Sequence, residues 1–316
     1  MNEVKSNTRI AGIDVSKSRL DVAVHGAETM IALANGMSGH AELTGRLRSW
    51  GVTRVGLEAT GGYERGVVEA LQGAGFEVVL HQPLEVRLFA RIRRLRAKND
   101  RIDARLIALA TAQVDTVKAA ADPRLAELAE RLTAYEQACD LATLLKTQME
   151  HVRLPDLLQD AQDQLTALVA RKKRLAADLI QRVKAWPDLE RRMTLLRSLP
   201  GVGPIVALGL LIRMPELGAM KHGQAAALVG VAPFDRDSGA RRGHRFIAGG
   251  RIRPRRLLYL AALAARRSDP ALKAFARRLV ENGKPPKVAI VAVMRKLIEA
   301  ANLVIARDRP WTPCTQ

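Results

Sequence analysis

The amino-acid sequence predicts an α/β domain at the N-terminus, a pair of long central helices and a mostly α-helical domain at the C-terminus. Strand and helix patterns alternate over residues 9–120, and apolar residues recur every three or four positions after Pro123. Short apolar helices separated by glycine-rich turns follow Pro187. We therefore expect three domains, which span residues 1–120, 121–186 and 187–316.

The N-terminal domain is predicted to contain a mixed β-sheet. Its first two strand patterns are joined by a short polar turn at residues 16–19, which is typical of an antiparallel hairpin. A hairpin followed by alternating strands and helices favours a mixed sheet with flanking helices over a purely parallel sheet. The expected strands are residues 9–15, 20–25, 30–34, 53–58 and 76–81, and the expected helices are residues 38–50 and 63–72.

The central segment predicts two long helices separated by Leu154 and Pro155. Their apolar positions follow a helical period that fits either a helical hairpin or a coiled coil. The heptad pattern is sustained for only about three repeats, and Lys172 interrupts an apolar position. Packing of the two helices within one chain and an oligomerisation stalk therefore both remain open.

The chain carries a large excess of positive charge. It has 51 Lys and Arg against 32 Asp and Glu, and residues 187–316 alone hold 24 basic against 9 acidic residues. The usual partner of such an excess is nucleic acid, although a generally basic solvated surface is the alternative. Aromatic residues make up only 3% of the chain, which argues against single-strand binding by rows of aromatic platforms.

Composition also argues against several other classes of protein. Hydrophobic residues make up 48% of the chain, which is typical of a globular protein and not of a disordered one. Cys139 and Cys314 lie far apart without a metal-ligand neighbour, so neither a disulfide framework nor a zinc site is supported. Because no apolar run reaches about 18 residues, we expect a soluble cytoplasmic protein without a membrane partner.

Four carboxylates form the first candidate site. Asp14 and Glu58 come at the ends of two predicted strands, and Asp100 and Asp103 share one face at the start of a predicted helix. Oxygen ligands without His or Cys suit Mg²⁺ or Mn²⁺, and two such ions can clamp the attacking and leaving oxygens of a phosphodiester displacement. A salt bridge competes for any single residue, but the joint arrangement, with glycines at 61 and 62, is more specific.

The segment Leu199-Pro-Gly-Val-Gly-Pro204 is a second candidate. Gly201 and Gly203 allow a turn with exposed N–H groups, and the N-terminus of the following helix can hold a phosphate. The segment resembles the hairpin of helix-hairpin-helix DNA-binding modules. A plain structural turn before a buried helix explains the same residues equally well.

Ser238 is the third candidate. Taken alone, Asp237-Ser-Gly239 is a turn, but nine arginines and no acidic residue follow between Ser238 and Ser268. Guanidinium groups can hold a phosphate and stabilise its developing charge, and a serine hydroxyl beside them can attack phosphorus to form a covalent protein–DNA link. The arginines expected to contact nucleic acid are Arg241, Arg242, Arg245, Arg251, Arg253, Arg255 and Arg256.

Several of these motifs resemble one known family. Ile13-Asp-Val-Ser-Lys17, Glu58-Ala-Thr-Gly-Gly-Tyr63 and Asp100-Arg-Ile-Asp-Ala104 are similar to signatures of the DEDD transposases of bacterial insertion sequences, which are related to Piv-type site-specific DNA invertases. Residues 229–259, 283–290 and 294–296 resemble the C-terminal domain of the same family. Asn99 stands where the family more often has Thr or Ser, which leaves the four carboxylates in place.

The resemblance implies a fold and a chemistry. The N-terminal domain is expected to have the RuvC-like, ribonuclease-H-like fold, with Asp14, Glu58, Asp100 and Asp103 as ligands of Mg²⁺ or Mn²⁺. Ser238 corresponds to the nucleophile of the family's Ser-Gly pair. The implied activity is excision and insertion of an insertion sequence through a phosphoserine link to DNA.

The resemblance also implies partners. A structured noncoding bridge RNA would pair with donor and target DNA, so the protein would read mainly shape and backbone. Members of the family assemble as tetramers, as a dimer of dimers, in which carboxylates of one subunit act with the serine of another. We accordingly expect a nucleoid-associated protein.

Two other functions remain open from the sequence. A Holliday-junction resolvase or structure-selective nuclease would use the carboxylates alone, with Ser238 as a turn residue. A catalytically inert nucleic-acid-binding protein would use neither set. A covalent protein–DNA species at Ser238 distinguishes the recombinase from both alternatives.

Overall fold

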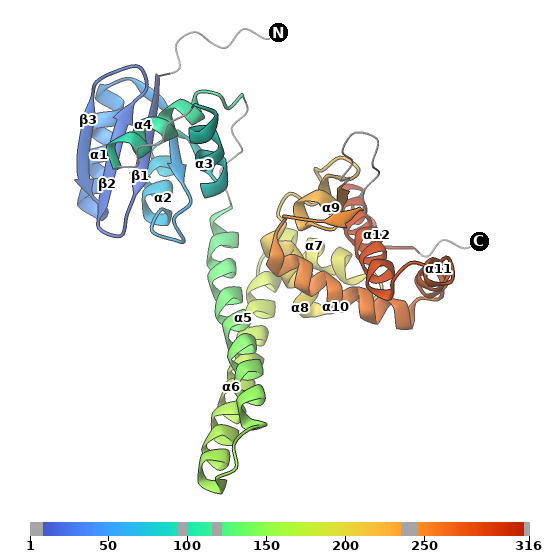
Figure 1. Cartoon of the computed structure of the whole chain (residues 1–316). Helices are drawn as coiled ribbons and strands as arrows, with labels where there is room; N and C mark the ends of the chain where they lie inside the picture. The colour runs from blue at the N-terminus through green and yellow to red at the C-terminus, as the bar shows by residue number, and fades with distance from the viewer. Residues whose placement is uncertain (1–8, 94–99, 116–121, 235–244, 313–316) are drawn as a thin grey trace. The chain divides into compact units, whose positions relative to one another are not determined.

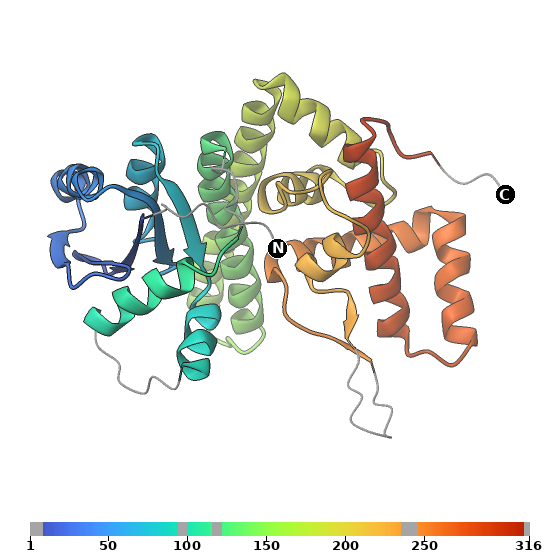
Figure 2. The same ribbon diagram turned by 90° about the horizontal axis from the view of Figure 1, so that it is seen from above.

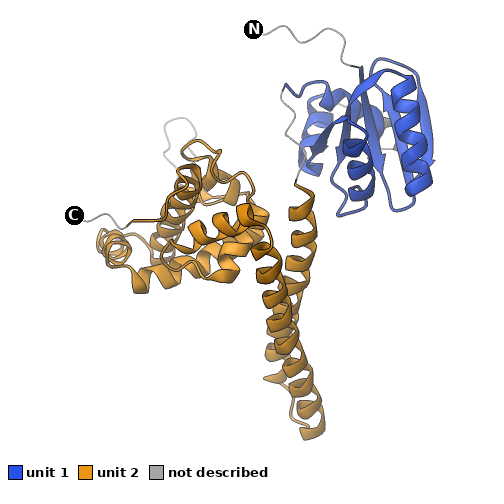
Figure 3. Ribbon diagram, turned by 180° about the vertical axis from the view of Figure 1, so that it is seen from behind, with its two compact units in different colours: residues 1–121 blue, residues 122–316 orange. Residues whose placement is uncertain are grey.

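The computed structural model of the chain describes residues 9–93, 100–115, 122–234 and 245–312, with only the backbone described at residues 100–102. Two compact units, Met1–Ala121 and Asp122–Gln316, are coloured separately in Figure 3. The two long central helices belong to the second unit. The division into three domains stays a prediction.

The described part of the N-terminal unit is built on a five-stranded sheet with the order β3-β2-β1-β4-β5 (Figure 1). The strands β1, β2 and β3 pair antiparallel, whereas β1, β4 and β5 pair parallel. This arrangement confirms the predicted hairpin and the mixed sheet. The strands are β1 Arg9–Val15, β2 Arg19–Val24, β3 Met30–Ala34, β4 Val52–Glu58 and β5 Glu77–His81.

Helices cover both faces of this sheet (Figure 2). Ile13 and Leu57 are buried in a core with Leu43 and Leu47 of α1, so these residues of β1 and β4 face α1 and α2. Because side chains alternate along a strand, their neighbours Asp14 and Glu58 face the other side, which α4 covers. The helices are α1 Met37–Ser49, α2 Arg65–Gly73, α3 Pro83–Ile92 and α4 Asp100–Thr111.

Two helix starts differ from the prediction. The helix expected from residue 38 begins at Met37, and Gly36 precedes it without a side-chain cap. The helix expected from residue 63 begins at Arg65, and Glu64 caps it by accepting a hydrogen bond from Val68 N at its backbone carbonyl. In the turn before it, Gly61 and Gly62 have φ values of 77° and 123°, which are left-handed conformations that favour glycine.

The helix α4 lies directly on the sheet because two glycines leave room for its backbone. A Cβ atom on Gly12 of β1 would lie 2.2 Å from Ala108 N and 2.3 Å from Ala104 O. A Cβ atom on Gly56 of β4 would lie 1.8 Å from Thr111 Oγ1. Because these two positions lack side chains, the backbone of α4 can pack directly on β1 and β4.

The described part of the C-terminal unit is almost entirely helical, as predicted. The helix α8 is buried along nearly its whole length at the centre of the core. None of the helices in the described part of the chain combines the length and apolar character that a membrane span needs. The helices are α5 Pro123–Met149, α6 Pro155–Lys184, α7 Pro187–Arg197, α8 Pro204–Arg213, α9 Gln224–Val229, α10 Ile252–Ser268, α11 Pro270–Glu281 and α12 Pro286–Ala306.

Proline marks where many of these helices begin. Each of α5, α6, α7, α8, α11 and α12 has proline as its first residue. The first N–H of a helix has no partner within the helix, so proline, which lacks an N–H, costs nothing there and presets φ. This is why boundaries expected near Pro123, Pro155 and Pro187 agree with the structure.

The helices α5 and α6 lie side by side as a helical hairpin (Figure 1). At one end of the hairpin, Leu128 of α5 and Leu179 of α6 are buried in the C-terminal core. Near the connection between the helices, Leu144, Leu154 and Leu157 are more than half exposed. The coiled coil stays a prediction, because a single chain leaves open what packs against these leucines.

We predict that Gly12→Ala lowers the free energy of unfolding of the N-terminal unit by about 1–3 kcal/mol, because the added methyl group meets helix backbone that cannot rotate away. Urea unfolding followed by circular dichroism measures this loss. Gly45→Ala is the matched control, since Gly45 lies within α1 with open space around it. That control should stabilise by about 0.5–1 kcal/mol. Equal effects of the two changes would contradict the packing argument.

Candidate catalytic site and nucleic-acid interface

Ionisable residues form a row across four neighbouring strands of the N-terminal sheet. In β1, Asp14 pairs with Asp21 of β2, and Ile13 pairs with Leu57 of β4, so Asp14 and Glu58 are neighbours in register. Glu58 in turn pairs with His81 of β5. Residues in register point to one face of a sheet, so Asp21, Asp14, Glu58 and His81 all lie on the face that α4 covers.

The helix α4 carries the other two predicted carboxylates. Asp103 lies in its first turn, directly before Ala104, whose carbonyl oxygen is the close neighbour of Gly12. Asp103, Asp14 and Glu58 are each half-buried. Asp100 is the first residue of α4, and its side chain lies outside the described residues. The structure thus places Asp14 beside Glu58. The start of α4 lies on the same face of the sheet.

Within the described residues, no three His, Cys, Asp or Glu side chains form a group that could hold a metal ion. The side chain of Asp100 is not among those described. The chemistry of Asp14, Glu58 and Asp103 fits a hard divalent cation, because all three offer only oxygen atoms and each keeps some contact with solvent. The assignment of the four carboxylates as metal ligands stays a prediction.

One amide side chain joins the turns that follow Asp14 and Glu58. Asn35 Nδ2 donates to Ser16 O at 2.8 Å and to Tyr63 O at 3.0 Å. Asn35 Oδ1 lies 2.8 Å from His40 Nε2, which fixes the orientation of the amide. Burial lowers the pKa of His40. Because Ser16 and Tyr63 follow the two strand-end carboxylates, Asn35 sets the spacing between the two turns.

The second of these turns is built around a buried carboxylate. Glu64 Oε2 accepts hydrogen bonds from Thr60 N at 3.1 Å, Thr60 Oγ1 at 2.9 Å and Gly62 N at 2.9 Å. Burial by itself raises the pKa of Glu64, but these hydrogen bonds, with one from its own backbone, leave that pKa below its usual value. The turn leaves the ring of Tyr63 half-exposed next to the site.

His81 ends the row as a buried neutral side chain. Its Nε2 lies 2.8 Å from Thr111 Oγ1, and that hydroxyl donates to Ile107 O at 2.7 Å. A hydroxyl has only one hydrogen, so the imidazole donates from Nε2. Burial lowers the pKa of His81, which keeps it neutral. The contact ties β5 to α4 beside Glu58.

Asp21, at the other end of the row, is nearly buried and paired with a cation. Arg19 Nε lies 2.9 Å and 3.1 Å from the two carboxylate oxygens of Asp21, and Nη2 lies 2.7 Å from one of them. The Arg19 side chain keeps 55% of its surface exposed. This ion pair lies next to Asp14 on the same face, so Arg19 compensates the negative charge that Asp21 would otherwise add beside Asp14.

In the C-terminal unit, Ser238, Arg241 and Arg242 lie outside the described residues. The chain on either side of them forms a two-stranded ladder, β6 Pro233–Phe234 and β7 Phe246–Ile247. In it Phe234 pairs with Phe246, and Pro233 with Ile247. The ladder therefore sets where the segment that contains Ser238 begins and ends.

The structure divides the remaining predicted arginines into two groups. Arg251 forms a bidentate ion pair with Glu216 at 2.6 Å and 2.8 Å, and Arg253 pairs with Glu136 of α5. Arg255 Nη1 donates to Gly230 O at 3.1 Å and to Gly249 O at 2.9 Å. Three of the expected phosphate ligands thus also brace the protein. The other two, Arg245 and Arg256, are exposed, and Arg253 is exposed as well.

The two glycines of the turn before α8 have different surroundings. Gly201 has a φ of 74°, and a Cβ atom there would lie 2.3 Å from Ala261 O of α10. Close packing against α10 therefore explains Gly201 structurally. Gly203 is exposed and precedes the first residue of α8, with open space around it. The helix-hairpin-helix resemblance and a phosphate contact at either glycine stay predictions.

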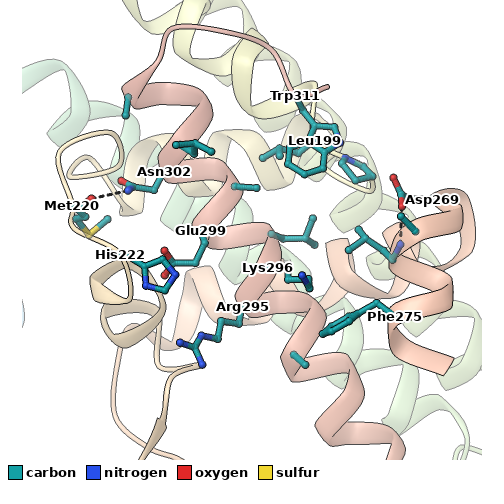
Figure 4. Close-up of a pocket in the computed structure, with 18 residues that line it drawn as sticks. Leu199, Met220, His222, Asp269, Phe275, Arg295, Lys296, Glu299, Asn302 and Trp311 are labelled. Carbon is teal, nitrogen blue, oxygen red and sulfur yellow. Dashed lines mark hydrogen bonds between the residues drawn. The ribbon is translucent and has the colours of Figure 1, made fainter. Parts of the chain in front are cut away.

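A cavity of about 860 Å³ lies between α11, α12 and the segment before α9 (Figure 4). Three of its polar side chains brace neighbouring segments. Asn302 Nδ2 donates to Met220 O at 2.8 Å, and Glu299 accepts hydrogen bonds from two backbone N–H groups at the start of α9. Asp269 accepts from the backbone of α11. These three side chains therefore stabilise the fold around the cavity.

Two family models match the chain in succession. A model of DEDD type, described as a transposase, matches residues 11–152, and a model described as the IS116/IS110/IS902 family of transposases matches residues 193–277. Together the matched segments span well over half of the chain. The chain belongs to the IS110 family of transposases.

The family includes relatives that align along nearly the whole chain. The pilin gene-inverting proteins of Moraxella bovis and Moraxella lacunata are each 24% identical to it over 322 residues. Each alignment covers 95% of this chain and 96% of the relative. The chain is therefore a DNA-recombining enzyme of the transposase type, related to Piv-type invertases, which confirms the family resemblance expected from the motifs.

Two solved structures match about a third of the chain. RuvC of Thermus thermophilus in complex with a Holliday junction substrate is 18% identical, with a TM-score of 0.28, and the match covers 33% of this chain and 92% of that one. A second Thermus thermophilus RuvC structure is 19% identical, with a TM-score of 0.26 and coverage of 33% and 93%.

Sequence reasoning missed Asn35, Glu64, Asp21 and His81. Two of them carry a signal in the sequence: Asp21 breaks the apolar pattern of β2, and His81 is the last residue of β5, as Glu58 is of β4. Asn35 carries none, because the carbonyl groups that it joins are 19 and 28 residues away along the chain. Glu64 carries none either, although it bonds to Thr60 and Gly62 within its own turn. Only the folded chain reveals these contacts.

We predict that Asn35→Ala lowers the rate of DNA recombination about 10- to 100-fold and raises the Mn²⁺ concentration needed for half-maximal rate, because the turns after Asp14 and Glu58 lose their shared donor. Recombination assays over a Mn²⁺ titration measure both effects. Glu42→Gln is the control, since Glu42 forms an exposed ion pair with Arg46 on α1. A purely structural role for Asn35 would lower the melting temperature without moving the Mn²⁺ requirement.

Proposed function

We propose that this transposase excises and inserts a bacterial insertion sequence by metal-dependent strand exchange through a serine-linked DNA intermediate. The observation that carries the proposal is the row on the sheet, where Asp14 and Glu58 are neighbours in register on the face covered by α4. The helix α4 begins at Asp100 and has Asp103 in its first turn. This arrangement supports the proposal that carboxylates from two strand ends and one helix start act together.

Asp14, Glu58, Asp100 and Asp103 are the residues that would hold Mg²⁺ or Mn²⁺. A divalent ion bound there supplies positive charge to the oxygens of the phosphodiester during displacement. Asp21, neutralised by Arg19, adds little further negative charge beside Asp14. His81, held neutral by burial and by Thr111, adds no competing positive charge beside Glu58.

Ser238 is the proposed nucleophile. Its hydroxyl oxygen attacks phosphorus, so that a bond from Oγ to phosphorus forms and a bond from phosphorus to a deoxyribose oxygen breaks. The proton leaves Oγ, and the released sugar oxygen takes up a proton. Attack by the sugar hydroxyl of the incoming strand then reverses these steps and regenerates the serine. The number of phosphodiester bonds is conserved, so no external energy source is required.

Exposed arginines near this segment are proposed to hold the DNA backbone. Arg256 and Arg245 are exposed, and Arg241 and Arg242 follow Ser238 by a few residues. Charge-assisted hydrogen bonds from guanidinium groups match the geometry of phosphate oxygens. Arg251, Arg253 and Arg255 brace the start of α10 through Glu216, Glu136 and backbone carbonyls.

The proposal includes the partners that the family resemblance implies. These are donor and target DNA duplexes, a structured noncoding bridge RNA and a tetramer in which carboxylates of one subunit act with the serine of another. The excess of 24 basic over 9 acidic residues after Trp186 supports a partner set with more than one polyanion. RNA that copurifies with the protein identifies the bridge RNA by sequencing.

We predict that Asp14→Ala, Glu58→Ala and Asp103→Ala each abolish strand exchange and weaken Mn²⁺ binding, because each removes an oxygen ligand. Recombination of a plasmid carrying the element's ends measures the first effect, and calorimetry measures the second. Asp115→Ala is the control, since Asp115 is an exposed acidic residue shortly after α4. Wild-type recombination by any two of the three variants would rule out the metal-site assignment.

We predict that Ser238→Ala still folds and binds DNA, RNA and Mn²⁺ but forms no covalent DNA adduct, because only the attacking oxygen is removed. Ser238→Cys should keep a trace of adduct, since a thiolate is a competent nucleophile in a cationic environment. Digestion of trapped reactions and mapping of the DNA-linked peptide measure the adduct, with Ser268→Ala as the control. Full recombination by Ser238→Ala would leave the carboxylate nuclease as the better description.

A further inference from the structure

A second cavity lies where β7 meets α10 and α12. We call it the β7–α10 pocket. Its volume is about 440 Å³, which falls in the range of roughly 300–1,000 Å³ that small-ligand sites occupy. The residues that define it here are Ile247, Arg255, Arg256, Tyr259, Val291 and Met294.

The lining of the β7–α10 pocket combines three kinds of group. The ring of Tyr259, which is 39% exposed, offers an aromatic face. Ile247 and Met294 supply apolar walls, and exposed Arg256 supplies a cation three residues before Tyr259 on α10. None of the described residues that line the pocket is acidic. An aromatic face, apolar walls and a guanidinium are the groups that hold an unstacked base with its phosphate.

The polar groups of the pocket are few. Arg255 is engaged with the carbonyl oxygens of Gly230 and Gly249, so it stiffens the wall of the pocket. The remaining lining is apolar apart from Arg256 and the Tyr259 hydroxyl. A base held here would be bound by stacking and through its phosphate. The pocket offers few hydrogen-bonding groups that could distinguish the edge of one base from that of another. The pocket should therefore tolerate all four bases.

The pocket lies close to the proposed nucleophile along the chain. Ile247 lines it and pairs with Pro233 across the ladder. Ser238 follows Pro233 by five residues, a length of chain that spans at most about 18 Å. A nucleotide in the pocket would thus lie within a few nucleotides of the phosphate joined to Ser238.

We propose that the β7–α10 pocket binds an unstacked nucleobase, through Tyr259 and Arg256, next to the site of strand cleavage. The proposal rests on the function proposed above, because strand exchange requires bases near the cut to leave the duplex. Tyr259 stacks on the base and Arg256 holds its phosphate. The pocket then stabilises the unpaired nucleotide while a strand is exchanged.

The test compares two fluorescein-labelled DNA duplexes of one sequence, one fully paired and one with a single extrahelical adenine. Binding of the full chain is measured by anisotropy in EDTA, so that cleavage plays no part. Wild-type protein should bind the duplex with the extrahelical base more tightly, and thymine, cytosine or guanine in its place should bind similarly. A hairpin RNA with one extrahelical adenine tells whether the RNA partner supplies the base instead.

Tyr259→Ala should reduce the affinity for the extrahelical duplex about 5- to 150-fold while leaving the paired duplex unchanged, because one stacking contact is lost. Tyr259→Phe should keep the preference, since the ring remains. Val280→Ala is the matched control, because Val280 is 41% exposed on α11 and does not line the pocket.

Several results would overturn the inference. They are no preference in the wild-type protein, an equal loss on both duplexes for Tyr259→Ala, or a loss for Tyr259→Phe as large as that for Tyr259→Ala. Covalent adduct formation with Mg²⁺, measured on the same preparations, reports on the proposed function separately. An adduct without any base preference would contradict base binding in the pocket and support the recombinase function. A base preference without an adduct would support base binding and contradict the recombinase function.

Discussion

The contact between α4 and the sheet constrains the carboxylate site, because α4 can lie on β1 and β4 only where those strands lack side chains. Gly12 and Gly56 provide that space, and each precedes a carboxylate by two residues. The alternation of a strand then points Asp14 and Glu58 toward the helix that packs on the glycines. The same two glycines thus allow the packing and lie on the same face of the sheet as the two carboxylates. Thr111 and His81 fasten the other end of α4 to β5.

Glycines, which have no side chain, also allow close packing in the C-terminal unit. Gly201 lets the turn before α8 approach α10, and Gly250 lets its own segment approach Gly230, where a Cβ atom would lie 2.3 Å from Gly230 N. Arg255 then bridges the carbonyl oxygens of Gly230 and Gly249. These contacts lie directly beside the ladder that leads into the Ser238 segment. In both units, backbone packing at glycines holds elements next to the proposed catalytic residues.

Charge has two uses in this chain. Arg251, Arg253 and Arg255 meet acidic side chains or carbonyl oxygens, so part of the arginine-rich stretch serves folding. Arg251 and Arg255 are partly buried, and a partly buried arginine needs such partners because an uncompensated charge is costly to remove from water. Exposed residues such as Arg256 leave their charge for a polyanion. A count of arginines therefore overstates how many could contact a nucleic acid. Arginines whose guanidinium groups are engaged within the protein are less available for such a contact.

Local patterns in the sequence determined much of this protein. Proline at helix starts placed the boundaries of α5, α6 and α7, and two strand patterns joined by a short polar turn identified β1 and β2, because both signals act within a few residues. The motifs around Asp14, Glu58 and Asp100, together with segments near the C-terminus, indicated the family. Tertiary structure alone decided that Asn35 joins two turns and that Arg253 pairs with Glu136. These contacts join residues whose meeting depends on strand register and helix packing, and no local pattern encodes a distance across the fold.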